Sequence, residues 1–181
     1  MRNLRRTALS LVLAVALLGA MAVPAFAANP TVSITVRASV VSITNSQNTW
    51  DVGVVAAGGA AVKWGSADDY STLTNTGSVN VNVAIQGTDL VHAGNATLNW
   101  TLAADGDPGD QIYGLKATIT DNYNILVKPS AYANLVADLD HTTGNTVTWS
   151  MTFYVPTVFD ANDDGGEKSA TVTLVASAAG G

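Results

Sequence analysis

Hydrophobic and polar side chains alternate along much of the chain, with the period of two that is typical of β-strands with one buried face. The alternation is clearest in five stretches that carry an apolar residue at every second position: Val79 to Ile85, Ala96 to Leu102, Tyr113 to Ile119, Val147 to Val155 and Ala170 to Ala176. Shorter and less regular strands are expected at residues 50–55, 61–64, 70–74 and 123–127.

Turn-forming residues separate these stretches at about the 8–12-residue spacing that is typical of β-sandwiches. Helical periodicity is limited to a single turn at most, over Asn134 to Asp140. We therefore predict an all-β fold, an antiparallel β-sandwich of about eight or nine strands whose order is either immunoglobulin-like or that of a jelly-roll. Because no linker or internal repeat interrupts the pattern, we expect residues 28–181 to form a single domain.

The first 27 residues have the three parts of a secretory signal peptide. Arg2, Arg5 and Arg6 form a basic segment, an apolar run covers Leu9 to Val23, and Ala25-Phe-Ala27 supplies the cleavage signal. The run is too short to cross a membrane, and no second apolar span follows it. We therefore expect a secreted protein whose mature chain, residues 28–181, contains no membrane span.

The mature chain begins with a long apolar strand, which we predict over residues 29–44. This strand can serve as a donor strand. Five residues share one of its faces: Val32, Ile34, Val36, Ala38 and Val40. The phase changes at Val41, as a β-bulge or a switch between two sheets would produce, and Arg37 is the only charge in the strand's apolar part, 31–44. Such a strand can complete the chain's own sheet, as sequential strands usually do, or add to the sheet of a neighbour by β-augmentation.

Charge and composition exclude several classes of protein. The sequence has 8 basic residues, 14 acidic residues and no cysteine. Three of the basic residues lie in the signal peptide, so the 154-residue mature chain has 5 basic against 14 acidic residues, a net charge of −9. Nucleic-acid binding requires the opposite charge and is not expected. Without cysteine the chain has neither a disulfide scaffold nor a thiol nucleophile, so its stability must come from an apolar core.

One loop has the spacing of a calcium-binding loop. In Asp160-Ala-Asn162-Asp-Asp164-Gly165 oxygen-bearing side chains alternate and a glycine allows a tight turn, as at the start of an EF-hand loop. The twelfth position is a threonine instead of the bidentate glutamate of that motif. Two interpretations follow: a Ca²⁺ site formed by Asp160, Asn162, Asp164 and Glu167, or a hairpin turn whose side chains bond to their own backbone.

The sequence contains little that points to catalysis. The acidic residues cluster in turns, where water keeps them ionised. His92 and His141 lie in polar stretches with no second histidine at the spacing of metal ligands. Neither a Gly-x-Ser-x-Gly nor a His-Glu-x-x-His pattern occurs. We therefore expect a protein that is not an enzyme.

The four tryptophans raise the question of carbohydrate binding, because aromatic faces stack on sugar rings. Trp50, Trp100 and Trp149 share their phase with apolar neighbours, so we expect all three in the core. Trp64 lies in a loop-like stretch that ends at Tyr70, where we expect exposure. Trp64 and Tyr70 are therefore the candidate ligand-binding residues for a cell-wall polymer or a glycan.

Two Asn-x-Thr sequons, which begin at Asn95 and Asn99, are also present. Such sequons are common in threonine-rich strands and by themselves indicate little.

The layout of the mature chain resembles that of a known group of surface proteins. Behind the N-terminal strand come four further segments: Thr49-Trp-Asp-Val-Gly53, Asn75-Thr-Gly-Ser-Val-Asn-Val-Asn-Val83, Asn99-Trp-Thr-Leu102 and Thr171-Val-Thr-Leu-Val-Ala-Ser177. This order resembles that of small secreted β-sandwich surface proteins of prokaryotes and is similar to TasA/camelysin-like biofilm fibre subunits and archaeal bundling-pilus subunits. The resemblance implies a jelly-roll protomer whose N-terminal strand inserts into the next subunit of an extracellular filament.

A partial resemblance to WxL surface domains, which attach to the cell wall, rests on Trp100-Thr-Leu102. The second motif of those domains is absent, because the later tryptophan gives Trp149-Ser-Met151.

Two functions are therefore expected. The first is a secreted structural subunit of the cell surface or biofilm matrix, which forms fibres with copies of itself by strand donation from residues 29–44, with Ca²⁺ as a stabilising ion. The alternative is a monomeric β-sandwich module that binds a cell-wall polymer or carbohydrate.

Overall fold

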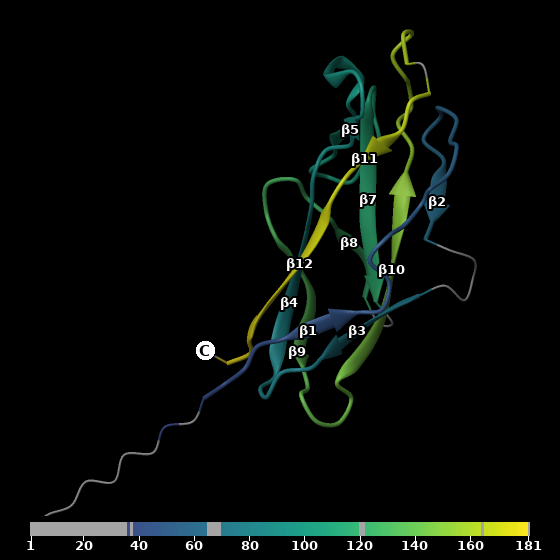
Figure 1. The fold of residues 1–181 in the computed structure, drawn as a ribbon. Helices are drawn as coiled ribbons and strands as arrows, with labels where there is room; N and C mark the ends of the chain where they lie inside the picture. The colour runs from purple at the N-terminus through teal and green to yellow at the C-terminus, as the bar shows by residue number, and fades with distance from the viewer. Residues whose placement is uncertain (1–35, 37, 65–69, 120–121, 164, 181) are drawn as a thin grey trace, which may run out of the picture. The chain divides into compact units, whose positions relative to one another are not determined.

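The computed structural model describes residues 36, 38–64, 70–119, 122–163 and 165–180 (Figure 1). The predicted signal peptide, Val32, Ile34 and Asp164 lie outside these residues. Contacts divide the chain after Arg37, and the domain described below begins at Ala38. It is nearly all β.

The larger sheet contains seven strands: β1 (Ile43–Asn45), β2 (Ala61–Lys63), β3 (Ser71–Asn75), β6 (Thr101–Leu102), β7 (Ile112–Ile119), β8 (Asn122–Leu126) and β10 (Thr146–Tyr154). Their order is β1-β3-β10-β7-β6, with β2 also paired to β10 and β8 also paired to β7. The pairs are antiparallel except for the short parallel pair of β6 and β7. The long strand β10 is thus the centre of this sheet, because β3 pairs with its first half and β2 with its last residues.

The second sheet contains three antiparallel strands: β4 (Val81–Gly87), β9 (Ala133–Leu139) and β12 (Val172–Ala178). Their order is β12-β4-β9, so β4 is central and the other two strands are edges. A short antiparallel pair of β5 (Val91–His92) and β11 (Lys168–Ser169) and a 3₁₀ turn, η1 (Ala96–Leu98), complete the described elements.

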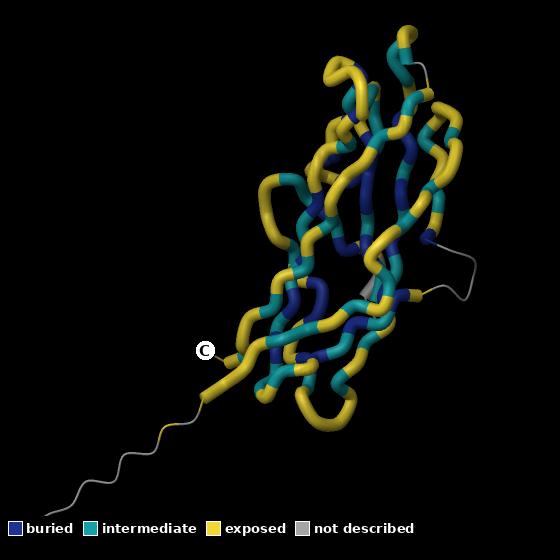
Figure 2. Tube along the Cα trace, viewed as in Figure 1, coloured by how far each residue is buried: buried dark blue, intermediate teal, exposed yellow. Residues whose placement is uncertain are grey.

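The alternation of the sequence becomes the inward and outward alternation of the sheets. In β4 the residues Val81, Val83 and Ile85 are fully buried, and the same pattern holds along β7 and β10 (Figure 2). Inward side chains of both main sheets belong to one hydrophobic cluster, which includes Val83 and Trp149. The prediction of an all-β, antiparallel fold is therefore confirmed, and the arrangement of the two sheets is consistent with a β-sandwich.

Two local expectations were wrong. The stretch Ala96 to Leu102 forms the 3₁₀ turn and only a two-residue strand, although its apolar phase still buries Leu98, Trp100 and Leu102. Asn134 to Asp140, the one stretch in which the sequence allowed a helical turn, lies almost entirely in strand β9. Residues 50–55 form no strand, although Trp50, Val52 and Val55 pack against the core.

Candidate functional site

A large groove opens between the two sheets on one side of the sandwich. Its volume is about 1400 Å³, and its inner surface consists of core side chains: Trp50, Trp64, Trp100, Tyr113, Leu115, Trp149, Met151, Phe153 and Phe159. Two chain segments border it, one within residues 43–55 and the other within residues 163–174. The groove therefore reaches side chains of the hydrophobic core, although little of their surface is exposed, with Tyr113 at 1% and Trp149 at 2%.

Stacked aromatic rings line the groove. The ring centroids of Trp50 and Trp64 lie 5.8 Å apart in a stacked arrangement, and Trp64 meets Trp149 edge-on at 5.2 Å. Trp64 is only 7% exposed, so the expectation that it lies in an exposed loop was wrong, whereas Tyr70 is 53% exposed. The two predicted ligand-binding residues thus differ in setting: Trp64 belongs to the groove and the core, and Tyr70 to the surface.

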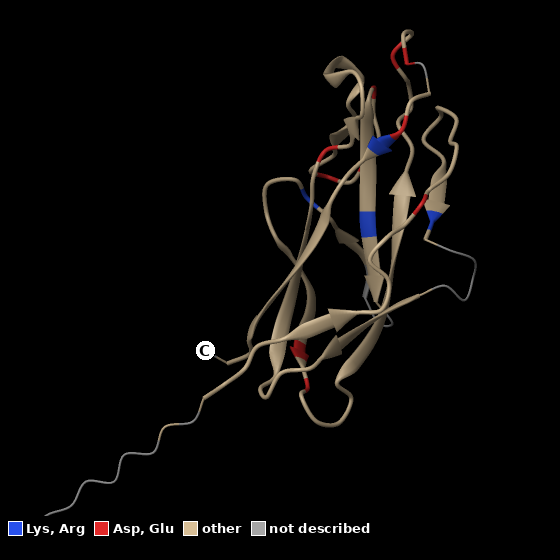
Figure 3. Cartoon of the chain, viewed as in Figure 1, with Lys and Arg blue, Asp and Glu red and all other residues tan. Residues whose placement is uncertain are grey.

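Strand β12 forms part of one border of the groove. Val172 and Leu174 line the groove, and β12 pairs with β4 over all seven of its positions without a break in register. Among the described residues no strand pairs with its other edge. Its sequence, Val-Thr-Leu-Val-Ala-Ser-Ala, contains neither charge nor proline, and Figure 3 shows the strand without a charged residue. Native edge strands are usually protected by one of these devices or by a bulge, so β12 is an edge that is open to a further strand.

The register of β12 shows which of its backbone groups are free. Thr88 N–H donates to the Thr171 carbonyl (3.1 Å), and Ala179 N–H donates to the Asn80 carbonyl (2.8 Å). In an antiparallel ladder the backbone groups of alternate residues point to the same side. Residues 173, 175 and 177 therefore bond to β4, and Val172, Leu174 and Ala176 direct their N–H and C=O groups to the free edge.

Within the described part of the chain, few interactions hold the opposite border of the groove, residues 47–55. Gln47 N–H donates to Ser71 Oγ (3.2 Å), and Gly53 N–H donates to Asp51 Oδ1 (2.8 Å). The segment joins no sheet, and the side chain of Val54 is fully exposed. Unpaired backbone therefore lies on both borders of the groove.

The end of the predicted N-terminal strand is fixed to its own domain. Strand β1 pairs with β3, and Asn45 Oδ1 accepts hydrogen bonds from Trp149 Nε1 (2.9 Å) and Ser71 Oγ (2.6 Å). Just before it, Ser78 N–H donates to the Val40 carbonyl (2.9 Å), and Val40 N–H donates to Ser78 Oγ (2.9 Å). Residues 40–45 thus belong to the chain's own sandwich.

The residues that precede Val40 belong to no strand where the structure describes them. Val36 is 85% exposed and Val40 is 56% exposed. Of the predicted assembly-strand residues, Val36 thus offers an apolar side chain to solvent, and Val40 offers its side chain while its backbone is held. The segment available for donation ends before Val40.

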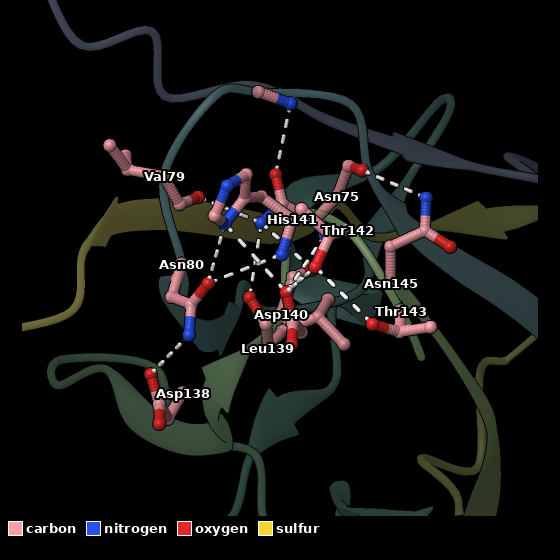
Figure 4. Close-up of polar contacts among 11 residues, drawn as sticks. Asn75, Val79, Asn80, Asp138, Leu139, Asp140, His141, Thr142, Thr143 and Asn145 are labelled. Atoms are coloured by element: carbon pink, nitrogen blue, oxygen red, sulfur yellow. Dashed lines mark hydrogen bonds and ion pairs between the residues drawn. The ribbon is translucent and has the colours of Figure 1, made fainter.

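A buried amide holds the turn to which Val40 is attached. Asn75 is fully buried, and its Nδ2 donates to the carbonyls of Val79 (2.9 Å), Leu139 (3.0 Å) and Asp140 (3.1 Å), as Figure 4 shows. Its Oδ1 accepts from Gly77 N–H (2.9 Å). A Cβ at Gly77 would overlap the Val40 carbonyl, so glycine is required where the N-terminal segment crosses this turn.

An ion pair that the sequence analysis missed stands at the border of the groove. Lys168 Nζ lies 2.9 Å from both carboxylate oxygens of Asp163, with the two side chains only 7% and 5% exposed. The same ammonium lies 4.7 Å from the centroid of the Trp100 ring. Burial raises the pKa of Asp163, but hydrogen bonds from Lys168 and from Gly165 N–H lower it further, and the net shift is downward. Nothing in the sequence signals this pair, because only the folded loop brings the two charges together.

The candidate calcium residues are arranged as follows. Asp160 Oδ1 accepts from the backbone N–H (2.7 Å) and Nδ2 (3.0 Å) of Asn162, Asp164 is outside the described residues, and Glu167 has an exposed side chain. Within the described residues no three His, Cys, Asp or Glu side chains are placed to hold a metal ion. The hydrogen bonds of Asp160 are those of the hairpin-turn interpretation, and the Ca²⁺ site stays a prediction.

No family model matches the sequence, and no curated protein matches it at a significant level. In the part of the chain that the structure describes, no helix has the length and apolarity needed to cross a membrane.

Proposed function

We propose that the protein is a secreted structural subunit of the cell surface or extracellular matrix, which assembles into fibres when the N-terminal strand of one protomer enters the groove of the next. The observation that carries the proposal is the aromatic groove beside β12, an edge strand with no charge, proline or bulge. An apolar groove and a free sheet edge, side by side, match the two needs of an incoming strand: pockets for alternate side chains and partners for its backbone.

The donor in this proposal is residues 28–39. They carry apolar side chains at alternate positions, Val32, Ile34 and Val36, with Arg37 as their only charged side chain. At about 3.3 Å per residue, twelve extended residues reach roughly 40 Å. Strand β12, with seven residues, needs about 23 Å. The donor is therefore long enough to cover the free edge and still connect to Val40.

The expected energetics favour insertion. Each valine or isoleucine that moves from water into the groove contributes roughly 1.5–3 kcal/mol. Backbone hydrogen bonds to the free groups of Val172, Leu174 and Ala176 add a net contribution of about 0.5–1.5 kcal/mol each. Association and ordering of the strand oppose these terms, so assembly is expected to depend on concentration.

The competing function is a monomeric module that holds a cell-wall polymer or glycan. The same groove would then serve as the ligand site, with Trp50 and Trp64 as its stacking surface. The two functions differ in what the N-terminal segment does, because only the fibre subunit requires it.

The test compares the mature chain, residues 28–181, with variants of its N-terminal segment by light scattering and negative-stain electron microscopy. We expect regular filaments from the mature chain and none after deletion of residues 28–39. The triple variant Val32→Asp/Ile34→Asp/Val36→Asp should also fail to assemble. The matched control Thr31→Asp/Ser33→Asp/Thr35→Asp adds the same charge on the other face and should retain more assembly.

A synthetic peptide of residues 28–39 gives an independent readout. It should bind the truncated domain, change the tryptophan fluorescence of the groove and stop filament growth of the mature chain. Filaments from the truncated domain would refute strand donation. A mature chain that stays monomeric at every concentration would refute the fibre function and direct the search to glycans and cell-wall fractions.

A further inference from the structure

The two Asn-x-Thr sequons lie four residues apart, and the fold gives them opposite settings. The first comprises Asn95, Ala96 and Thr97, and the second comprises Asn99, Trp100 and Thr101. An asparagine in this sequence context can accept an oligosaccharide in a secreted protein only where its side chain reaches the surface. The two sequons therefore differ in whether their asparagine can act as an acceptor.

Asn95 has the setting of an acceptor. Asn95, Ala96 and Thr97 are all exposed. The Oδ1 atom of Asn95 accepts from Thr97 Oγ1 (2.8 Å) and from Thr97 N–H (3.0 Å). The two side chains that define the sequon are therefore already in contact. The amide nitrogen Nδ2 is the atom that would carry the sugar, and among the described residues it donates no hydrogen bond.

The backbone around Asn95 is held in place by buried neighbours. His92 is buried, and its Nδ1 accepts from the N–H groups of Gly94 (3.1 Å) and Asn95 (2.9 Å). On the other side, Leu98 is buried in the domain. Asn95 and Thr97 are thus presented on a fixed protrusion between two anchors.

Asn99 has the opposite setting. Its Oδ1 accepts from His92 N–H (2.8 Å), and its side chain is half-buried between the buried residues Leu98 and Trp100. Trp100 also exchanges two backbone hydrogen bonds of 2.9 Å with Leu90. A transferase would have to pull Trp100 out of the core to bind the second sequon.

We propose that Asn95 is the acceptor of an asparagine-linked oligosaccharide in the folded protein and that Asn99 is not. In the reaction, Asn95 Nδ2 forms a bond to the anomeric carbon of a lipid-linked oligosaccharide. The bond from that carbon to the diphosphate of the lipid breaks, the lipid diphosphate leaves with the electron pair, and Nδ2 loses one proton. The site is independent of fibre assembly.

The test uses the folded mature chain, a purified asparagine oligosaccharyltransferase that requires only Asn-x-Thr, and its lipid-linked oligosaccharide. Intact-mass measurement and peptide mapping should find one glycan, on Asn95. Asn95→Gln and Thr97→Val should abolish it, Thr97→Ser should retain it because the hydroxyl remains, and Asn99→Gln should leave it unchanged.

A synthetic peptide of residues 88–104 is the control for the fold, because it presents both sequons without burial. We expect modification of both asparagines in the peptide and of Asn95 alone in the folded chain. A glycan on Asn99 of the folded chain would overturn the proposal. Absence of a glycan from Asn95 in the folded chain would overturn it as well, whether or not the peptide is modified.

Discussion

The two edge strands of the three-stranded sheet differ in how well they can pair with a further strand. Strand β9 pairs with β4 through two register shifts, and Asp138, near its end, has a positive φ of 53°. A bulged, charged strand is a poor template for further pairing. Strand β12 pairs with β4 in unbroken register over seven residues and carries no charge.

This difference indicates that the open edge is a specific feature and not a general property of the domain. The same β4 strand separates the two edges, so both have the same backbone partner. Only the β12 side adjoins the groove. The proposed strand donation requires this asymmetry, with one protected edge and one unprotected edge beside the groove.

The largest effect is expected from a proline placed on the free edge of β12. Ala176→Pro removes an N–H group that faces the free edge and leaves the bonds of residues 175 and 177 to β4 in place. The lost hydrogen bond and the bulk of the ring should raise the concentration needed for assembly by on the order of 100-fold. Sedimentation of filaments across a concentration series measures this change.

The matched control is Val175→Pro, which removes a bond to β4 itself and should lower the melting temperature of the domain. Ala176→Pro should melt within a few degrees of the unmodified chain, by roughly the shift expected for 1 kcal/mol or less. Filaments from Ala176→Pro at the original concentration would show that β12 is not the acceptor edge.

The next prediction concerns the side-chain amide of Asn75, which joins β9 to the turn that holds Val40. Asn75→Ala leaves the carbonyls of Val79, Leu139 and Asp140 without their donor, and should lower the free energy of unfolding by about 2 kcal/mol. The control Asn145→Ala removes one hydrogen bond, of 3.4 Å to the Asn75 carbonyl, and should cost less than about 1 kcal/mol. Urea unfolding measures both values, and equal losses would contradict a special role for Asn75.

The regular strands could be predicted from the sequence, whereas the open edge could not. In β4 and β10 the burial of the residues follows the period of two, and β7 follows it except at Gly114, because both faces of those strands have a defined environment. The residues of β12 show the same alternation, yet nothing in it reveals that one edge has no partner. Edge status depends on strand order, which arises from contacts between distant segments.

The tryptophans show the same limit. Trp100 and Trp149 were expected in the core from their phase, and both are buried. Trp64 was expected to be exposed, because the polar residues that follow it resemble a loop. Its burial depends on a stack against Trp50 and an edge contact with Trp149, which strand pairing brings together. The Asp163–Lys168 pair was missed for the same reason, since only the folded loop brings the charges together.

The smallest effect concerns that ion pair, which stands on the groove side of the molecule. Its carboxylate has a lowered pKa in the folded chain, so the ionised form is favoured by folding. The stabilisation is therefore present above the unfolded pKa, near 3.8, and is lost as the pH falls through the lower folded value. Asp163→Asn should lower the free energy of unfolding by about 1 kcal/mol at pH 7, because a hydrogen bond from Lys168 to a neutral amide oxygen is weaker than one to a carboxylate. Urea unfolding at pH 7, 5, 4 and 3 should show this difference shrinking toward zero at the acid end.

The surface pair of Lys116 and Asp107 is the control, since its atoms lie 3.7 Å apart and Asp107 is 78% exposed. Asp107→Asn should change the free energy by no more than a few tenths of a kcal/mol at any pH, at about the lower limit for exposed pairs. A loss for Asp163→Asn that persists unchanged at pH 3 would mean that the side chain stabilises the groove border by packing and not by its charge.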